Sequence, residues 1–193
     1  MKITNVTFLK SAANESGFPK FAYPEFAFFG RSNVGKSSLI NMIVSRKSLV
    51  KTGAKPGVTR LVNFFIINEN ISFADMPGFG YADLPQNIRG KFMPLIKNYI
   101  LNRDNLKIAF LLVDIRRTPD DMERNIVTEL AGRDKPVAVV ATKCDKLPKS
   151  RRLEAARKIA AEFMIDVDSI FFTSAKTGEG KREIHRLLGE YCI

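Results

Sequence analysis

Eight consecutive residues of the chain have the types and spacing of a phosphate-binding loop. Residues 30–37 read Gly-Arg-Ser-Asn-Val-Gly-Lys-Ser and match the pattern G-x-x-x-x-G-K-[ST] at every fixed position. In such a loop the backbone N–H groups surround the phosphates, Lys36 reaches the β and γ oxygens, and the hydroxyl of Ser37 ligates Mg²⁺. A glycine turn that happens to precede a helix is the alternative. A predicted strand before the loop and a predicted helix after it favour the binding of a nucleoside triphosphate.

Two later stretches could contact the γ-phosphate and the metal ion. Asp75-Met76-Pro77-Gly78 follows a predicted strand, so its carboxylate can hold Mg²⁺ through water and the N–H of Gly78 can meet the γ-phosphate. Thr59, in Pro56-Gly57-Val58-Thr59, lies in a polar stretch that could fold over the γ-phosphate and offer a hydroxyl to Mg²⁺. Either stretch alone could be an ordinary solvated turn. The prediction that they contact the phosphate and the metal ion depends on their order after the phosphate loop.

Two short loops have the composition of a guanine-binding site. Thr142-Lys143-Cys144-Asp145 follows one predicted strand, and Ser174-Ala175-Lys176 follows the last strand, which ends at Thr173. Ligands bind at the carboxyl ends of strands in such sheets. An ionised Asp145 can accept both the N1–H and the N2–H₂ of guanine, a pair that adenine does not present. We expect the stem of Lys143 to lie along the base and the N–H of Ala175 to meet the guanine O6.

The predicted site combines these motifs. Its nucleotide-binding residues are Gly30, Arg31, Ser32, Asn33, Val34, Gly35, Lys36, Ser37, Ser38, Gly57, Val58, Thr59, Asp75, Met76, Pro77, Gly78, Thr142, Lys143, Asp145, Thr173, Ser174 and Ala175. Its Mg²⁺ ligands are Ser37, Thr59 and, through water, Asp75. Lys36, Thr59 and Gly78 are expected to position the phosphates, and no residue is assigned a certain catalytic role.

Strands and helices alternate between the motifs. Apolar runs and alternating patterns predict strands over residues 2–11, 25–29, 61–67, 71–74, 107–113, 137–141 and 170–173. Helical spacing predicts helices over residues 37–45, 86–101, 151–164 and 181–191, and another that starts with Thr118 as its capping hydroxyl. This order predicts an α/β fold with a mostly parallel, doubly wound sheet, helices on both faces and an antiparallel hairpin at the edge. We expect a single domain over residues 25–193, with an N-terminal strand and connector, residues 1–24, packed on it.

The charge of the chain is strongly basic and unevenly distributed. The formal net charge is +11, and residues 1–60 hold ten lysines and arginines against two glutamates. A basic surface of this kind favours a polyanionic partner such as RNA. The alternative is a solvated basic face together with the charge that the nucleotide's own phosphates require. Charge alone does not choose between RNA, DNA and an anionic membrane.

Cysteine content and hydropathy indicate a compartment. Cys144 and Cys192 lack metal-ligand spacing and suit a reducing environment. The chain has no apolar run of about 18 residues and no signal-peptide pattern at its start. We therefore expect a cytoplasmic protein without stable membrane insertion.

The motifs together resemble the translation-factor class of P-loop GTPases, whose G domain carries five guanine-nucleotide motifs in the order found here. The closer resemblance is to the bacterial EngB family. It rests on Gly-Arg-Ser-Asn-Val-Gly-Lys-Ser-Ser-Leu-Ile-Asn at residues 30–41, Asp-Met-Pro-Gly-Phe-Gly-Tyr-Ala at residues 75–82, and the Thr-Lys-x-Asp form. It covers nearly the whole chain. The resemblance implies a Mg²⁺-dependent GTPase that converts GTP to GDP and assists assembly of the large ribosomal subunit, with a link to cell division and septation.

Three positions bear on how such a protein would hydrolyse GTP. Most GTPases of this class carry asparagine where this chain has Thr142, so only part of the usual tether to the phosphate loop is expected. Phe79 stands where Ras-like enzymes place the glutamine that orients the attacking water, which predicts slow intrinsic turnover. In GTPases that the chain resembles, the residue matching Asn33 helps to bind a potassium ion that supplies positive charge. Asn33 could equally serve only to stabilise the loop turn.

Several alternatives remain open from the sequence. The leading interpretation is a monomeric assembly factor that docks on ribosomal RNA and protein through basic residues near the loop, namely Arg46, Lys47, Lys51, Lys55 and Arg60. The other is a GTP-regulated scaffold at a membrane or division complex, with incidental hydrolysis. An ATP-dependent kinase is disfavoured by Asp145. Arg116 and Arg117 could contact a partner or satisfy the following helix, and His185 is expected to be a surface side chain.

Overall fold

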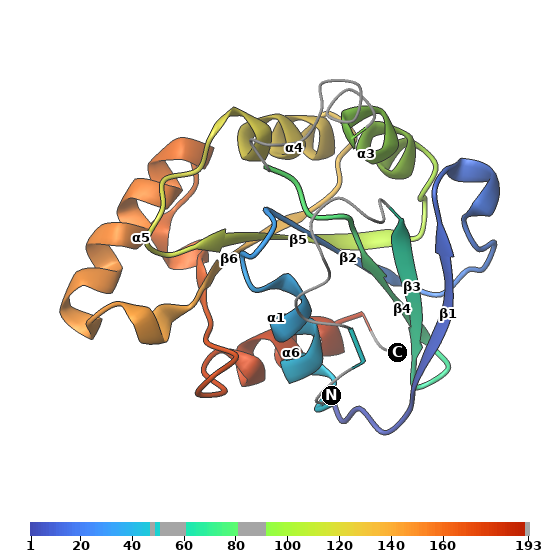
Figure 1. Cartoon of the computed structure of the whole chain (residues 1–193), viewed down its shortest axis with the longest axis horizontal. Helices are drawn as coiled ribbons and strands as arrows, with labels where there is room; N and C mark the ends of the chain where they lie inside the picture. Colours follow the sequence, from blue (N-terminus) through green and yellow to red (C-terminus); the bar gives the residue numbers. More distant parts are fainter. Residues whose placement is uncertain (47–48, 51–60, 81–91, 192–193) are drawn as a thin grey trace.

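A seven-stranded sheet forms the centre of the molecule. The computed structural model describes residues 1–46, 49–50, 61–80 and 92–191, and its strands lie in the order β1-β3-β4-β2-β5-β6-β7 (Figure 1). Their bounds are β1 Val6–Ala12, β2 Glu25–Gly30, β3 Val62–Ile67, β4 Ile71–Asp75, β5 Leu106–Asp114, β6 Val137–Thr142 and β7 Phe171–Phe172. β3 runs antiparallel to both of its neighbours, and the other adjacent pairs are parallel. The predicted hairpin is thus β3–β4, and β1 forms the edge beside it.

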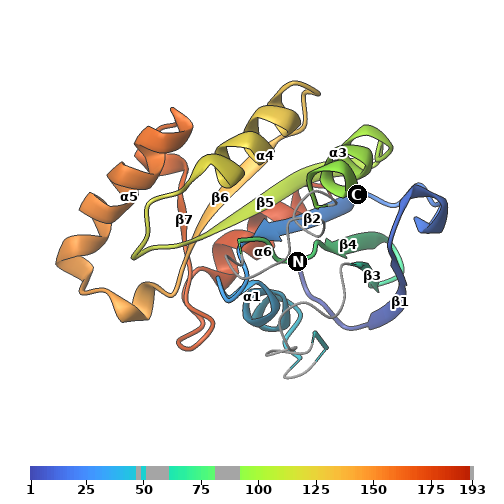
Figure 2. The ribbon, with the colours of Figure 1, turned by 45° about the horizontal axis from the view of Figure 1, so that its top comes forward.

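Helices cover both faces of the sheet. α3 (Phe92–Leu101), α4 (Asp121–Ala131) and α5 (Lys149–Phe163) pack in sequence on one face, while α1 (Lys36–Ile43) and α6 (Lys181–Gly189) lie together on the other. Figures 1 and 2 show this layering, with α5 beside the β6–β7 end of the sheet. The predicted doubly wound α/β architecture is confirmed. None of the helices in the described ranges is long and apolar enough to cross a membrane.

Two apolar cores lie on the two faces, and single strands contribute to both. In β2, Phe26 and Phe28 point towards α1 and α6, whereas Ala27 and Phe29 point towards α3 and α4. The period of two along a strand explains this division. It also explains why the central strands read as continuous apolar runs, since both faces are covered.

A buried ionic cluster fastens the N-terminal connector to the sheet. Glu25, at the start of β2, is fully buried and accepts hydrogen bonds from Arg103 Nε (2.8 Å) and Nη2 (2.6 Å), Tyr99 Oη (2.6 Å) and Ser72 Oγ (2.9 Å). The Arg103 Nη1 also donates to the carbonyl oxygen of Pro19 at 2.8 Å. Sequence patterns did not predict this cluster, which lies at the amino end of β2, away from the phosphate loop.

Two local predictions were wrong. Helix α4 begins at Asp121 with Asp120 as its N-cap, so Thr118 is not the capping residue. A carboxylate that accepts from the N–H of Met122 at 3.0 Å caps the helix instead. His185 is half-buried and not a free surface side chain, because its ring nitrogens lie 2.9 Å from the carbonyl oxygen of Met1 and 2.8 Å from that of Ile43. It joins α6, the end of α1 and the first residue of the chain.

Candidate nucleotide-binding site

The phosphate loop has the backbone shape that its sequence predicts. β2 ends at Gly30 and α1 begins at Lys36, with Gly35 as an N-cap at φ 106° and without a side-chain cap hydrogen bond. This φ favours glycine, and Asn33 also adopts a left-handed conformation, at φ 63°. The N–H groups of the first turn of α1 therefore face the loop and not a capping side chain. They form the kind of anion site that phosphates occupy at helix N-termini.

Lys36 and Asp75 form an ion pair at the centre of the site. β2 and β4 are parallel neighbours, so the end of β4 brings Asp75 next to the phosphate loop. Both side chains are largely buried, and the Nδ2 of Asn63 lies 3.5 Å from the second Asp75 oxygen. A single phosphate–metal unit could thus contact the ammonium and the carboxylate together. The structure brings these two predicted site residues into contact.

The oxygen donors here suit Mg²⁺. Asp75 offers a carboxylate and Ser37, at the start of α1, offers a hydroxyl, and Mg²⁺ prefers hard oxygen ligands with several waters retained. Across the described ranges there is no group of three or more histidine, cysteine, aspartate or glutamate residues that could hold another metal. The third predicted ligand, Thr59, lies outside the described residues together with Gly57 and Val58.

The stretch after Asp75 runs along the phosphate loop. The N–H of Ser32 donates to the carbonyl oxygen of Phe79 at 2.8 Å. A Cβ on Gly78 would lie 2.8 Å from the Oγ of Ser32, so this close approach requires glycine. The Phe79 side chain is only 2% exposed and packs in the core below α3 and α4. It anchors the stretch, and Met76 and Pro77 are likewise buried.

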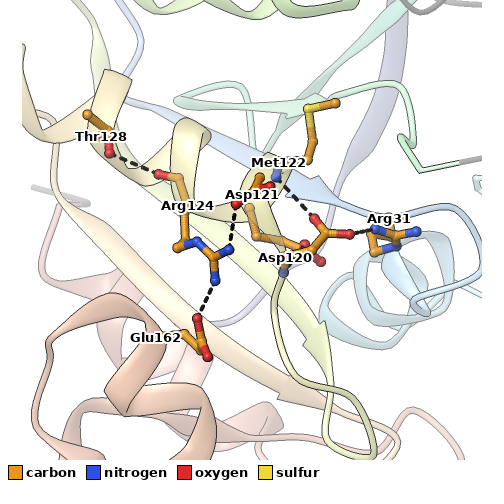
Figure 3. Close-up of polar contacts among 8 residues, drawn as sticks. Arg31, Asp120, Asp121, Met122, Arg124, Thr128 and Glu162 are labelled. Carbon is orange, nitrogen blue, oxygen red and sulfur yellow. Dashed lines mark hydrogen bonds and ion pairs between the residues drawn. The ribbon is translucent and has the colours of Figure 1, made fainter.

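Arg31 points away from the phosphate loop and towards α4. Its guanidinium forms an ion pair with Asp120, the N-cap of α4 (Figure 3). It also donates to the carbonyl oxygen of Gly80 at 3.0 Å. A Cβ on Gly80 would lie 2.5 Å from the Arg31 guanidinium carbon. The Arg31 side chain therefore connects three segments: the loop, the stretch after β4 and the start of α4.

The start of α4 holds two coupled carboxyl groups. Asp120 and Glu123 form a capping box, in which Glu123 accepts from the N–H of Asp120 at 3.0 Å. Burial and the neighbouring Asp120 raise the pKa of Glu123 to about 7. The hydrogen bond from Glu123, with the charge of Arg31, holds the pKa of Asp120 below its ordinary value.

In the same helix Arg124 pairs with Asp121 at 2.5 Å and with Glu162 of α5 (Figure 3).

Thr142 and Lys143 tie the predicted base loop to the phosphate loop. The Thr142 hydroxyl lies 2.7 Å from the carbonyl oxygen of Val34, which supplies the partial tether expected of threonine at this position. Lys143, in a left-handed conformation at φ 58°, places its Nζ 2.6 Å from the carbonyl oxygen of Asn33 and 3.0 Å from Asp114 Oδ2. Its stem therefore follows a fixed path between these anchors.

Asp145 and Ser174 form the other side of the base loop. The hydroxyl of Ser174, a fully buried residue, donates to Asp145 Oδ1 at 2.7 Å. This hydrogen bond lowers the pKa of Asp145, and the charges of Lys146 and Lys176 contribute. The carboxylate is therefore ionised at neutral pH and acceptor-only, as guanine recognition requires.

One cavity of about 190 Å³ unites residues from three separate motifs. Its predicted members are Gly35, Ser38, Thr142, Lys143, Asp145, Thr173 and Ala175. Leu39 and Lys146, which were not predicted, also line the cavity, as does Lys176, which the predicted loop contains but to which no role was given. Asp114 does not line this cavity but holds Lys143, which does, and it was not predicted either. Its place at a strand end, like that of Asp75, is the signal that could have found it. Val34, at 4% exposed, and Met76, at 1%, have side chains in the core, so they could contact a nucleotide only through the backbone.

Comparisons with known proteins agree with this geometry. Residues 25–143 match the model of the family described as 50S ribosome-binding GTPase. The chain is 41% identical over 192 residues to a probable GTP-binding protein EngB of Desulfatibacillum aliphaticivorans, covering 100% of this chain and 94% of that one. It is 42% identical over 191 residues to the EngB of Geotalea daltonii, covering 98% and 92%.

A solved structure agrees as well. The crystal structure of a probable GTP-binding protein engB superposes with a TM-score of 0.72 at 29% identity, over 86% of this chain and 97% of that one. Era of Aquifex aeolicus bound to GDP and AlF4⁻, at 24% identity and TM-score 0.66 over 89% and 57% of the two chains, shares the fold. The phosphate loop and the base loop lie together in the sheet, and the relatives match nearly the whole chain. The chain therefore belongs to the EngB family of GTP-binding P-loop GTPases.

Proposed function

We propose that this protein is a Mg²⁺-dependent GTPase switch, which converts GTP to GDP and phosphate and acts in assembly of the large ribosomal subunit. The observation that carries the nucleotide part is the cavity in which Asp145 and Lys143 meet the phosphate loop. The family description, 50S ribosome-binding GTPase, and the net charge of +11 support the ribosomal part. A role in cell division and septation belongs to the same proposal. We propose a cytoplasmic monomer whose GTP-binding domain spans residues 25–193, with residues 1–24 packed on it.

The side chains at the site suggest how the triphosphate would be held. Lys36 exchanges its ion pair with Asp75 for the β and γ oxygens, which leaves the carboxylate to bind a metal-ligated water. Ser37, Thr59 and Asp75 would hold Mg²⁺, which neutralises the charge that develops on the phosphates. The N–H of Gly78 would donate to the γ-phosphate, and its contact with Ser32 keeps it close to the loop.

Hydrolysis would then be slow unless a partner assists it. The buried side chain of Phe79 is apolar, so it supplies no group that could orient an attacking water. Asn33 could recruit a potassium ion that adds positive charge near the phosphates, or it could serve the loop turn alone. Hydrolysis rates measured in potassium and in sodium buffers, with an Asn33→Ala variant beside the wild type, separate the two roles. Equal rates in both buffers would remove the potassium role.

The proposed switch works through two segments. Thr59 and Gly78 contact Mg²⁺ and the γ-phosphate only in the GTP state, so hydrolysis releases the stretches around residues 47–60 and 78–85. The basic residues near the first segment, Arg46, Lys47, Lys51, Lys55 and Arg60, are candidates for contact with ribosomal RNA. Of these, only Arg46 lies within the described residues, where it is exposed.

A pelleting experiment tests the ribosomal role. The purified protein is sedimented with ribosomal subunits from cell extract in the presence of a non-hydrolysable GTP analogue or GDP. We expect analogue-dependent binding to large-subunit particles, and none for a Lys36→Ala variant that cannot hold the triphosphate. No particle binding in either state, with GTP affinity intact, would contradict the assembly role. Co-sedimentation with anionic vesicles would then favour the alternative, a GTP-regulated scaffold at a membrane or division complex.

A further inference from the structure

The first turn of α5 carries positive charge where a helix is least favourable for it. Lys149, Arg151 and Arg152 occupy this turn, which contains no acidic residue, and the N-cap Pro148 makes no side-chain cap hydrogen bond. Cations at a helix N-terminus oppose the helix dipole. α4 follows the usual rule, since it starts with the Asp120 cap followed by Asp121 and Glu123. The helix dipole therefore does not explain the charges at the start of α5.

Two of these three cations make no ion pair within the described residues, although Arg151 lies near enough to Glu154 to help lower the pKa of that carboxyl. Arg152 pairs with Glu179 at 2.7 Å and donates to the carbonyl oxygen of Leu147 at 3.1 Å, so its role is structural. Lys149 and Arg151 are exposed, and neither side chain forms an ion pair or hydrogen bond with any residue in the described part of the chain. Their charge is available to a partner.

Two more exposed lysines lie beside them. Lys146 ends the short 3₁₀ turn Cys144–Lys146, three residues before Lys149, and Lys176 lies in the loop after β7. Both lie near enough to Asp145 to lower its pKa, and both line the base cavity. We call the set Lys146, Lys149, Arg151 and Lys176 the basic rim. It runs from the opening of the base cavity to the start of α5.

We infer that the basic rim binds the backbone phosphates of RNA. The first turn of α5 has no side-chain cap. Although the N–H of Arg151 donates to the carbonyl oxygen of Pro148 at 2.9 Å, the other N–H groups of this turn add donors for a phosphate oxygen, because helix N-termini bind anions. The four cations of the basic rim outnumber the two carboxylates near them, Asp145 and Glu154, and this excess of positive charge suits a chain of regularly spaced negative charges. This inference rests on the proposed function in one respect: the RNA that we expect to bind is the RNA of the large ribosomal subunit.

An anionic membrane fits the basic rim less well. A helix that lies on a bilayer needs a wide apolar face beside its cations. The apolar face of α5, formed by Ala156, Ile159, Ala160 and Phe163, is buried against the rest of the fold. Leu153 is the large apolar side chain that the helix exposes next to Lys149, and a single leucine gives little area for insertion. Electrostatic contact with phosphates remains the interaction that the basic rim can make.

The test removes two rim charges that do not line the nucleotide cavity. Lys149→Ala/Arg151→Ala is compared with Lys107→Ala/Arg133→Ala, which removes an exposed lysine at the start of β5 and an exposed arginine in the turn after α4. Binding to deproteinised large-subunit RNA is measured by filter retention over a range of salt concentrations. Each lost phosphate contact lowers the slope of log K against log salt by about 0.7 to 0.9. We expect the rim variant to bind about tenfold more weakly, with a slope smaller by about 1.4 to 1.8.

The controls keep folding and function separate from docking. GDP affinity should be the same in both variants, and the rim variant should unfold at the wild-type temperature or above it, because cations that oppose the helix dipole have been removed. Equal salt slopes for the rim variant and the wild type would overturn the inference. The inference would also be overturned if the rim variant lost binding to anionic vesicles but kept its binding to RNA. If particles still pellet normally with the rim variant while its RNA slope is unchanged, the proposed function stands and the docking surface lies elsewhere.

Discussion

The side-chain nitrogen of Lys143 lies 3.0 Å from a carboxylate oxygen of Asp114, and the two residues come from the ends of adjacent strands. Asp114 ends β5 and also accepts from Arg116 Nε at 2.9 Å and Nη2 at 2.7 Å. Burial raises the pKa of Asp114, but the hydrogen bonds from Arg116 and Lys143 outweigh it and hold the pKa below the usual value. A fixed negative charge therefore positions the lysine whose stem is expected to lie along the base.

The first prediction concerns this pair. Asp114→Asn removes the charge that holds Lys143, so we expect the affinity for GDP to fall about tenfold, which corresponds to about 1.4 kcal/mol. The affinity for a GTP analogue should fall by the same factor, because Lys143 is expected to contact the base and not the γ-phosphate. Titration of a fluorescent nucleotide measures both. Arg116→Gln, which leaves the Lys143–Asp114 pair in place, is the control and should change either affinity by less than about twofold. A loss confined to the GTP analogue would contradict this role for Asp114.

The contrast between Asp114 and Asp75 shows how far sequence reasoning reaches into the site. Asp75 was predicted because it is followed by a glycine and preceded by a phosphate loop, a local pattern with a chemical reason. Asp114 has the same place at a strand end, but its partner Lys143 is specified only when β5 and β6 become neighbours. Motifs formed by residues close together in the sequence can be predicted from it. The contacts that support these motifs depend on which strands become neighbours, and the sequence pattern does not show this.

The elements of the fold likewise fall into those that the sequence predicted and those that it did not. Strands and helices with clear apolar periods were predicted, because each period reflects burial against the sheet. The Glu25–Arg103 pair was missed, since its members lie 78 residues apart and charged residues are expected at the surface. The cap of α4 was misassigned to Thr118 because Thr-Pro-Asp-Asp contains two competing cap residues, and only the backbone shows which of them accepts from the helix.

The second prediction concerns the stability of the buried pair. Arg103→Met leaves the carboxylate of Glu25 buried and without its cation, which should cost about 3–5 kcal/mol of unfolding free energy. Denaturant unfolding measures this cost. Lys97→Met is the control, because Lys97 forms a half-exposed pair with Glu129 at 2.5 Å and should cost less than about 1 kcal/mol.

A double variant checks the physical reason. Glu25→Gln/Arg103→Met removes both charges. Of the Tyr99 and Ser72 hydroxyls, which bond to different oxygens of Glu25, one can still donate to the glutamine carbonyl oxygen and the other can accept from its NH₂. The double variant should therefore lose less stability than the sum of the two single variants. GDP affinity of the folded protein should not change, because the cluster lies at the amino end of β2, opposite the phosphate loop. Simple additivity of the two single costs would argue against a mutual charge interaction.

The third prediction concerns the pH dependence of stability. The pKa of Glu123 is about 7 in the folded chain, above its ordinary value of 4.5, so the folded state keeps a proton that the unfolded state releases between these values. The free energy of unfolding must then fall as the pH rises through this window. Glu123→Gln keeps the neutral form at every pH. It should remove this fall, which amounts to at most about 3 kcal/mol between about pH 4.5 and about pH 7.

Unfolding at a series of pH values tests the assignment. Asp120 contributes with the opposite sign, because its pKa is lowered, and its effect belongs to more acidic solutions. Glu183→Gln, at an exposed position on α6, is the control and should follow the wild-type pH profile. If Glu123→Gln also follows the wild-type profile, the shared proton between Asp120 and Glu123 is not the cause.

The fourth prediction concerns the choice of base. Asp145 accepts from Ser174 through one oxygen and is ionised at neutral pH, so it can accept from both N1–H and N2–H₂ of guanine. Asp145→Asn replaces one acceptor oxygen with a donor group, which opposes the guanine amine but matches the carbonyl of xanthine. We expect GTP affinity to fall about a hundredfold or more and xanthosine triphosphate affinity to rise. Competition titrations with both nucleotides measure the switch, with Asp168→Asn, at an exposed carboxylate, as the control. A folded Asp145→Asn variant that still prefers GTP would require another residue to read the base, and the 190 Å³ cavity would lose its role in guanine selection.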